Sequence, residues 1–212
     1  MIDFVPLAPF AIASLIIILA PGADVFLLLR VSVSHGVSAG LGALGGIHLG
    51  NAIQAALMIS GIGLAVSRIP MALTVLEVAG ALYLLYLAAS SIRAVRRGPG
   101  PTVSESAEEP EPQKISSPFL QGLFANLTNP KVLIFFIAFF PQFIGKSASP
   151  PFQLLVLSAV FIGLAVIWEG IIVLGAGKVG KTMNSVRFTQ AMDVICAIAF
   201  TLLAVFILGS LA

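Results

Sequence analysis

The sequence has little charge and few residues that carry redox or metal chemistry. Only 9% of its 212 residues are charged, and it has two histidines, one tryptophan and one cysteine. The single cysteine, Cys196, excludes a disulfide or a two-cysteine redox relay within the chain. Histidine and cysteine do not recur at a useful helical spacing, so a transition-metal site is unsupported and no cofactor is expected. The two histidines also provide no nucleophile–base pair, so the sequence does not predict an enzyme.

What the sequence has instead is apolar surface. Hydrophobic residues make up 58% of the chain, and the mean hydropathy is +1.08. Soluble domains carry roughly 25% charged residues, so this composition predicts an integral membrane protein. The net charge is only +2, and the basic residues lie between apolar runs and form no stripe, which argues against nucleic-acid binding.

The apolar runs predict an all-α membrane protein with six transmembrane helices. A helix that crosses a bilayer needs about 20 mostly apolar residues. The predicted spans are Val5–Leu29, Ala39–Val66, Met71–Ile92, Pro118–Phe143, Phe152–Gly175 and Thr189–Leu211.

A polar segment divides these spans into two groups of three. Residues 98–117 are rich in proline, glycine, serine and glutamate, and cannot bury an apolar face. We therefore expect a first three-helix half at 1–97, a flexible cytoplasmic linker at 98–117 and a second three-helix half at 118–212.

The basic residues predict how the chain is oriented in the membrane. Eight of them lie in or beside the first, third and fifth connections, whereas only Arg68 and Lys146 lie on the opposite side. Because basic residues favour the cytoplasmic side, the odd-numbered connections are predicted in the cytoplasm and both termini outside. The eight are Arg30, Arg93, Arg96, Arg97, Lys114, Lys178, Lys181 and Arg187.

The first helix of each half contains a proline within its apolar run. Pro21-Gly22 interrupts the first span, and Asn129-Pro130 interrupts the fourth. Proline removes a backbone donor and clashes with the preceding turn, so both helices should be broken or kinked. With an odd number of spans in each half, the two halves have opposite orientations, as in transporters built from inverted repeats. A single break of this kind would be interpreted as an ordinary proline kink. Two breaks at corresponding positions of the two halves instead indicate a binding site.

A charged residue follows each proline. Asp24 and Lys131 lie deep in the first and fourth spans, where a lone charge costs several kcal/mol. We expect them to come together, either as an ion pair in the empty protein or as the groups that bind the two charged ends of a zwitterion. Carbonyl groups freed at the breaks are candidates to hold an ammonium group, and half-helix N-termini favour a carboxylate. A purely structural ion pair is an equally good interpretation.

Other polar residues lie within the predicted spans. Glu169 is a candidate proton-coupling group, or else a protonated residue that packs between helices. Asn51 and Gln54 are expected to form hydrogen bonds across helices, and His48 is interpreted as a packed histidine. Glycines four residues apart in the second span predict close helix packing within the bundle; these are Gly42, Gly46 and Gly50.

Three stretches together carry a family resemblance. They are "PGADVFLLLRVSVSHGVSAGLGALGGIHLGN", "AGALYLLYLAASSIR" and "FLQGLFANLTNPKVLIFFIAFFPQF". With these motifs in this order and six apolar runs, the chain resembles the amino-acid exporter family of lysine-exporter type, which includes homoserine and threonine efflux proteins. The resemblance covers nearly the whole chain. Many members have a second proline where Ala23 stands and often a basic residue near Glu77.

The resemblance implies a function. It implies secondary active export of amino acids or their derivatives across the bacterial inner membrane, coupled to the proton motive force. The expected partners are the small-molecule cargo, protons and the lipid bilayer. The family motif falls on Pro21, Gly22, Asp24, Asn129, Pro130 and Lys131.

A cation or metal-ion transporter of the same architecture is the alternative. It would need converging carboxylates, for which Asp24, Asn51 and Glu169 are the available cluster. The sequence leaves open which amino acid is exported, the proton stoichiometry, whether the protein forms a homo-oligomer, and whether Lys131 touches the cargo.

Overall fold

The computed structural model describes residues 3–20, 22–68, 70–97, 117–144, 149–176 and 186–210. Within these ranges the chain is helical with short connections and has no strand. The predicted all-α fold is therefore confirmed for the described residues. Pro21 and all of the predicted linker except Ser117 lie outside them.

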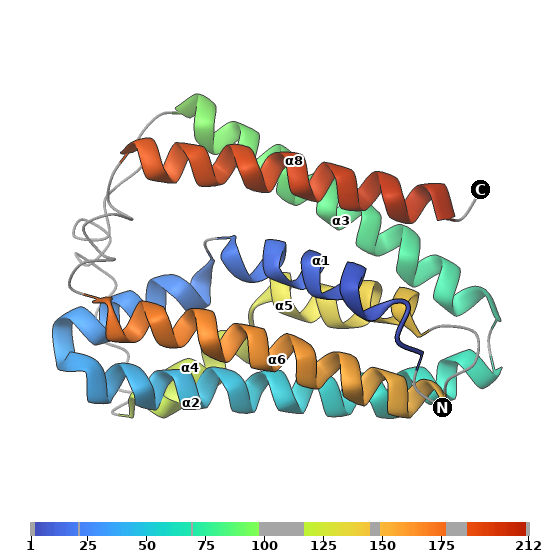
Figure 1. The fold of residues 1–212 in the computed structure, drawn as a ribbon, viewed down its shortest axis with the longest axis horizontal. Helices are drawn as coiled ribbons and strands as arrows, with labels where there is room; N and C mark the ends of the chain where they lie inside the picture. Colours follow the sequence, from blue (N-terminus) through green and yellow to red (C-terminus); the bar gives the residue numbers. More distant parts are fainter. Residues whose placement is uncertain are drawn as a thin grey trace.

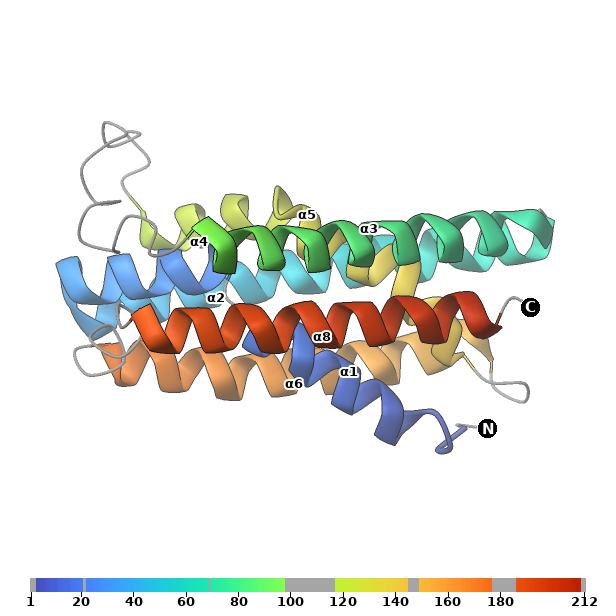
Figure 2. The same cartoon turned by 90° about the horizontal axis from the view of Figure 1, so that it is seen from above.

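The helices form two layers with shorter pieces between them. In Figure 1, α3 and α8 lie side by side in one layer, α2, α4 and α6 form the other, and α1 and α5 lie between. Figure 2 shows that α1 is inclined to the remaining helices. The bounds are α1 Leu7–Leu19, α2 Ala23–Arg68, α3 Pro70–Arg97, α4 Pro118–Leu127, α5 Pro130–Ile134, α6 Pro150–Leu174 and α8 Val186–Ser210.

The first predicted span is broken, and its second part is longer than predicted. α1 ends at Leu19, and Ala20 is extended, with φ −62° and ψ 120°. Helix resumes at Ala23 and continues past the predicted end at Leu29, so most of the predicted first connection is helical. Only Gly36, with φ 84° and ψ 169°, departs from helical geometry. The ribbon reverses direction there (Figure 1), because glycine accepts a positive φ that a side chain would disfavour.

The fourth predicted span is also broken where the proline predicts. α4 ends at Leu127, and Asn129 is extended before Pro130 begins α5. The second piece continues through a π-helix at Phe135–Phe139 and a 3₁₀-helix at Phe140–Phe143. It is inclined by 49° to α4.

Among the described residues, two helical stretches are long and apolar enough to cross a membrane. They are Ala23–Gly61 and Pro150–Leu174, and the bent pair from Pro118 to Phe143 would be a third if it forms one span. Three shorter apolar helices accompany them: Leu7–Leu19, Val78–Arg93 and Asp193–Gly209. The break near Ala20 is the reason that α1 is short. Six spans related by an inverted repeat stay a prediction.

α2 and α4 pack unusually closely. A Cβ atom placed on Gly46 would overlap the backbone carbonyl of Phe119, and one on Gly122 would overlap the backbone carbonyl of Ala43. Because glycine has no side chain, the backbones of the two helices can touch at these two positions. The predicted close packing within the bundle is confirmed at Gly46.

Gly46→Ala should therefore destabilise the protein. The added methyl group meets backbone atoms that cannot rotate away, and overpacking of this kind costs about 1–3 kcal/mol. We expect the melting temperature of the detergent-purified protein to fall by several degrees. Gly61→Ala is the matched control. Gly61 lies on the same helix as Gly46, but a Cβ there meets no atom within 4 Å. Equal melting temperatures for the two variants would contradict the packing described here.

Phenylalanine rings join α1 to the second broken helix. Phe10 is fully buried and packs edge-on against Phe140 and Phe143, with ring centroids 4.9 and 5.3 Å away. Phe136 and Phe140 are also fully buried and stack on one another. This cluster fixes α1 against α5 and its continuation, and so holds the two breaks together.

Candidate functional site

The break after α1 forms a site for a cation. A helix end leaves carbonyl groups without intrahelical partners. Here the carbonyl oxygens of Ile17 and Ala20 accept hydrogen bonds from the Lys131 ammonium, at 3.2 and 2.9 Å. The negative end of the helix dipole also favours a positive charge at this place. In this structure the freed carbonyls hold the ammonium group of the protein's own lysine, and their binding of a cargo ammonium stays a prediction.

The break between α4 and α5 contributes amide groups. The Asn129 side chain caps α5 by accepting a hydrogen bond from the Lys131 backbone N–H at 3.1 Å. Its Nδ2 donates to Asp24 Oδ2 at 3.1 Å, and Asn126 Nδ2 donates to the same oxygen at 3.2 Å. Each break therefore binds a charged side chain from the other.

Asp24 and Lys131 do not form the ion pair that the sequence suggested for the empty protein. Among the described residues, the one ion pair found within 4.0 Å joins two other residues. The reason is that each charge has nearer partners: backbone carbonyls for Lys131, and side-chain amides for Asp24. Asp24 Oδ1 is buried and has no hydrogen-bond partner. The second hypothesis, that the two residues bind opposite ends of a zwitterion, stays a prediction.

A network of amides extends from Asp24 into α2. Asn126 Nδ2 also donates to Asn51 Oδ1 at 2.9 Å, and Gln54 Nε2 donates to the Asn126 backbone oxygen at 2.9 Å. Asn51, Gln54 and Asn126 are all buried. The predicted cross-helix bonding of Asn51 and Gln54 is thus confirmed. Asn126 was not singled out in the sequence, although an asparagine one turn before an Asn-Pro break is a signal that points to it.

His48 and Glu169 lie at the far end of this network. His48 Nε2 and Glu169 Oε2 are 3.3 Å apart. Both atoms are buried, and neither makes a hydrogen bond, to the other or to any described group. His48 Nδ1 lies 3.4 Å from Asn51 Nδ2. Sequence reasoning treated His48 as a packed histidine and missed this contact, since the two residues belong to different helices and are far apart in the chain.

A small polar cavity lies at the centre of these groups. It is lined by Asp24, Asn51, Lys131 and Glu169 together with apolar side chains, and its volume is about 20 Å³. A water molecule needs roughly 10–15 Å³ measured in this way. The cavity therefore has room for about one water and is too small for an amino acid, so a cargo requires the helices to move apart.

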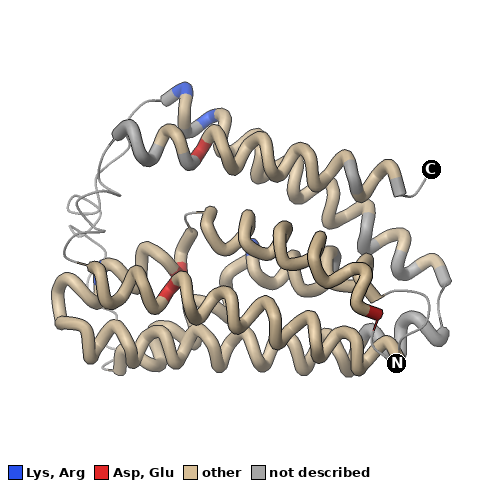
Figure 3. The backbone as a smooth tube through the Cα atoms, viewed as in Figure 1, with Lys and Arg blue, Asp and Glu red and all other residues tan. Residues whose placement is uncertain are grey.

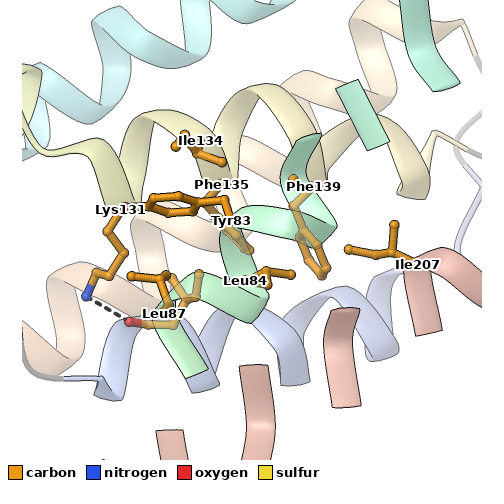
Figure 4. Close-up of a pocket in the computed structure, with 10 residues that line it drawn as sticks. Tyr83, Leu84, Leu87, Lys131, Ile134, Phe135, Phe139 and Ile207 are labelled. Atoms are coloured by element: carbon orange, nitrogen blue, oxygen red, sulfur yellow. Dashed lines mark hydrogen bonds between the residues drawn. The ribbon is translucent and has the colours of Figure 1, made fainter. Parts of the chain in front are cut away.

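A second, apolar cavity adjoins Lys131. Figure 4 shows the lysine side chain at its edge, with the hydrogen bond to a backbone oxygen drawn as a dashed line. Its volume is about 10 Å³, and its lining is aliphatic and aromatic. The labelled lining residues are Tyr83, Leu84, Leu87, Lys131, Ile134, Phe135, Phe139 and Ile207.

Charge is sparse elsewhere in the described helices (Figure 3). A larger groove of about 470 Å³ lies between α3 and α8, but Arg96 is its single charged residue, and it does not include the polar network. No group of three or more histidine, cysteine, aspartate or glutamate residues that could hold a metal ion occurs in the described part of the chain.

The remaining motif residues lie at the two breaks. A Cβ on Gly22 would be 2.9 Å from Lys131 Nζ, so the glycine leaves room for the ammonium group. Pro130 begins α5, where its missing N–H costs nothing. Pro21 lies outside the described residues.

Known proteins share this sequence pattern. The chain is 30% identical over 142 residues to a leucine efflux protein of Klebsiella pneumoniae subsp. pneumoniae, covering 67% of this chain and 65% of that protein. It is 31% identical over 139 residues to a leucine efflux protein of Salmonella typhimurium, covering 66% and 63%. These matches span just under two thirds of the length of either relative.

A further relative is an uncharacterized membrane protein of Pseudomonas aeruginosa, 32% identical over 155 residues, which cover 71% of this chain and 70% of the relative. No solved structure matches the chain. Residues 15–210 match the family described as LysE type translocator. The resemblance seen in the sequence is therefore confirmed: the chain belongs to the LysE type translocator family.

Proposed function

We propose that this protein is a secondary active exporter of amino acids, and that its cargo has an aliphatic side chain. Family membership supports transport across a membrane, and the names of the leucine efflux relatives support the cargo class. The proposal includes a location in the bacterial cytoplasmic membrane and six spans in two inverted halves.

The observation that carries the proposal is the ammonium site at the end of α1. Carbonyl oxygens of Ile17 and Ala20 bind an ammonium group that belongs to Lys131. The α-ammonium of an amino acid has the same chemistry, so a cargo can replace the lysine there or bind the unpartnered Asp24 Oδ1. The displaced Lys131 then faces the cargo carboxylate.

The neighbouring apolar cavity supports an aliphatic cargo. Lys131 lines both cavities, so once the helices move apart a cargo whose charged ends occupy the polar one can direct its side chain towards the apolar one. Apart from Tyr83 and Lys131, the side chains that line this cavity offer no hydrogen-bond partner to a polar or charged cargo side chain. Burial of a polar group without a partner is costly, which disfavours such cargo.

Coupling to the proton motive force is energetically sufficient. Moving one charge through 100 mV yields about 2.3 kcal/mol. That free energy sustains a cargo gradient of roughly fiftyfold. The alternative of a metal-ion transporter is not favoured, because the family and the names of the leucine efflux relatives support an amino-acid cargo.

A growth screen tests the proposal. Bacteria that express the protein should tolerate toxic analogues of leucine, isoleucine and valine at concentrations about tenfold higher than bacteria with an empty vector. Analogues of lysine and aspartate should give little protection. The His35→Gln variant is a control, because His35 is exposed and lines neither cavity. Absence of protection by every aliphatic analogue, with normal protein levels, would contradict the proposed cargo.

A further inference from the structure

We infer that Glu169 is the proton-binding residue of this transporter and that His48 is the residue that positions it. This inference rests on the proposed function, in that it assigns the site of the coupling ion. It extends that function by placing the proton on α6, whereas Asp24 and Lys131 lie on α2 and α5.

The first step is the charge balance of the polar cavity. Asp24, Lys131 and Glu169 all line it, so two carboxylates face one ammonium group. With all three ionised, the cavity holds one excess negative charge. A zwitterionic cargo is neutral and does not cancel this charge. One proton does, and uncompensated charge inside a membrane protein is costly.

The second step identifies which carboxylate takes the proton. Asp24 Oδ2 accepts two amide hydrogen bonds, from Asn126 and Asn129, and these stabilise its ionised form. Glu169 Oε2 has no hydrogen-bond donor at hydrogen-bonding geometry, although it is buried. Each carboxylate has one buried oxygen without a partner, but among the described residues two amides donate to Asp24 and no hydrogen bond to Glu169 is found. The ionised form of Glu169 is therefore the less stabilised of the two, so the proton belongs on Glu169.

The third step identifies which ring nitrogen of His48 carries the proton. Asn51 Oδ1 accepts a hydrogen bond from Asn126, which turns the Asn51 Nδ2 donor towards His48 Nδ1. Nδ1 must then be the acceptor nitrogen, and in neutral histidine the proton lies on Nε2. This nitrogen lies 3.3 Å from Glu169 Oε2, close but without hydrogen-bond geometry in this structure. A small reorientation of either side chain would let His48 donate to the carboxylate after Glu169 releases its proton.

Among the described residues, Asp24, Lys131 and Glu169 are the charged residues that line the polar cavity. In the described residues, α6 packs against α2, α1 and the 3₁₀-helix Phe140–Phe143. α1 and the 3₁₀-helix contain no charged or histidine residue. α2 contains Asp24 and His48, the exposed Arg30 and His35, and Arg68 at its end. Lys131 from α5 reaches the same cavity. The hydrogen-bonded series His48, Asn51, Asn126 and Asp24 connects the proton site with the cargo site.

The test compares two rates in liposomes that contain the purified protein. One is leucine accumulation driven by a pH gradient, and the other is exchange of labelled for unlabelled leucine without a gradient. We expect the ratio of the first to the second to fall at least tenfold in Glu169→Gln. The ratio should stay at the wild-type value in His35→Gln, the chain's other histidine. An unchanged ratio in Glu169→Gln, or equal loss of both rates, would overturn the inference.

A second measurement does not depend on transport. Trp168 is the chain's single tryptophan and precedes Glu169 on α6. Its fluorescence in detergent should change with pH in the wild type and in His35→Gln, and should not change in Glu169→Gln. In His48→Gln the change should shift by about one unit towards higher pH, because the ionised carboxylate loses its donor. An identical titration in Glu169→Gln and wild type would overturn the inference.

The two measurements separate this inference from the proposed function. If the wild type neither exchanges nor accumulates leucine but Trp168 still reports a titration that Glu169→Gln removes, the cargo is wrong and the proton site stands. If leucine exchange is normal and a sodium gradient, with no pH gradient, drives accumulation, the cargo stands and the proton site is overturned.

Discussion

Leucine export should fall about a hundredfold when Asp24 is replaced with asparagine. Asp24 Oδ2 accepts hydrogen bonds from two side-chain amides, while Oδ1 is buried without a partner. Asparagine has nearly the same shape but no charge. Its NH₂ group would either face the two amide donors or take the place of the unpartnered Oδ1. Losing one partner of a buried charged contact costs about 2–5 kcal/mol, a range of roughly 30-fold to 4000-fold that includes the expected hundredfold.

The measurement is leucine efflux from loaded cells at matched protein levels. Asp3→Asn is the matched control, since Asp3 lies near the N-terminus and its carboxylate accepts a hydrogen bond from the exposed Val5 backbone. We expect that variant to export within about twofold of the wild type, as substitutions away from special contacts have small effects. Normal efflux by Asp24→Asn would remove Asp24 from the site.

Lys131→Met should have an effect of similar size. Methionine fills much of the same volume, but it leaves the Ile17 and Ala20 carbonyls without their donor and removes the cation that would face the cargo carboxylate. We expect export to fall about a hundredfold, on the same reasoning about an isolated buried charge. In addition, leucine should no longer raise the melting temperature of the purified variant, whereas it should raise that of the wild type.

The thermal measurement separates binding from a structural role. If Lys131 only bridges helices, the variant will be less stable but leucine will still stabilise it. The double variant Asp24→Asn/Lys131→Met provides a second check, because it restores charge neutrality between the two positions. It should be more stable than either single variant and still fail to export. Efflux at the wild-type rate in Lys131→Met would contradict a role in cargo binding.

The positions of the breaks could be predicted because their cause is covalent. Proline lacks an N–H and restricts the residue before it, so Asn129 must leave the helical region wherever the surrounding chain packs. The same local reasoning accounts for the end of α1 before Pro21. The extent of the second helical piece could not be predicted, since polar residues after Leu29 resemble a connection although they continue the helix to the turn at Gly36.

The partners of each polar group could not be predicted from the sequence. Charge alone pairs Asp24 with Lys131, but hydrogen-bond partners depend on which atoms the packed helices bring within about 3 Å. The close approach of α2 and α4 at Gly46 and Gly122 is what brings Asn126 to Asn51. The contact of His48 with Glu169 similarly depends on how α2 packs against α6.

The exchange of charged side chains between the two breaks has a consequence for how such proteins diverge. Lys131 satisfies the end of α1, and Asp24 satisfies the amides that flank Pro130. A mutation at either position leaves groups of the opposite half without partners, so it is not corrected by a change nearby in the sequence. Lineages that alter one of these residues should therefore carry a second substitution in the other half of the chain.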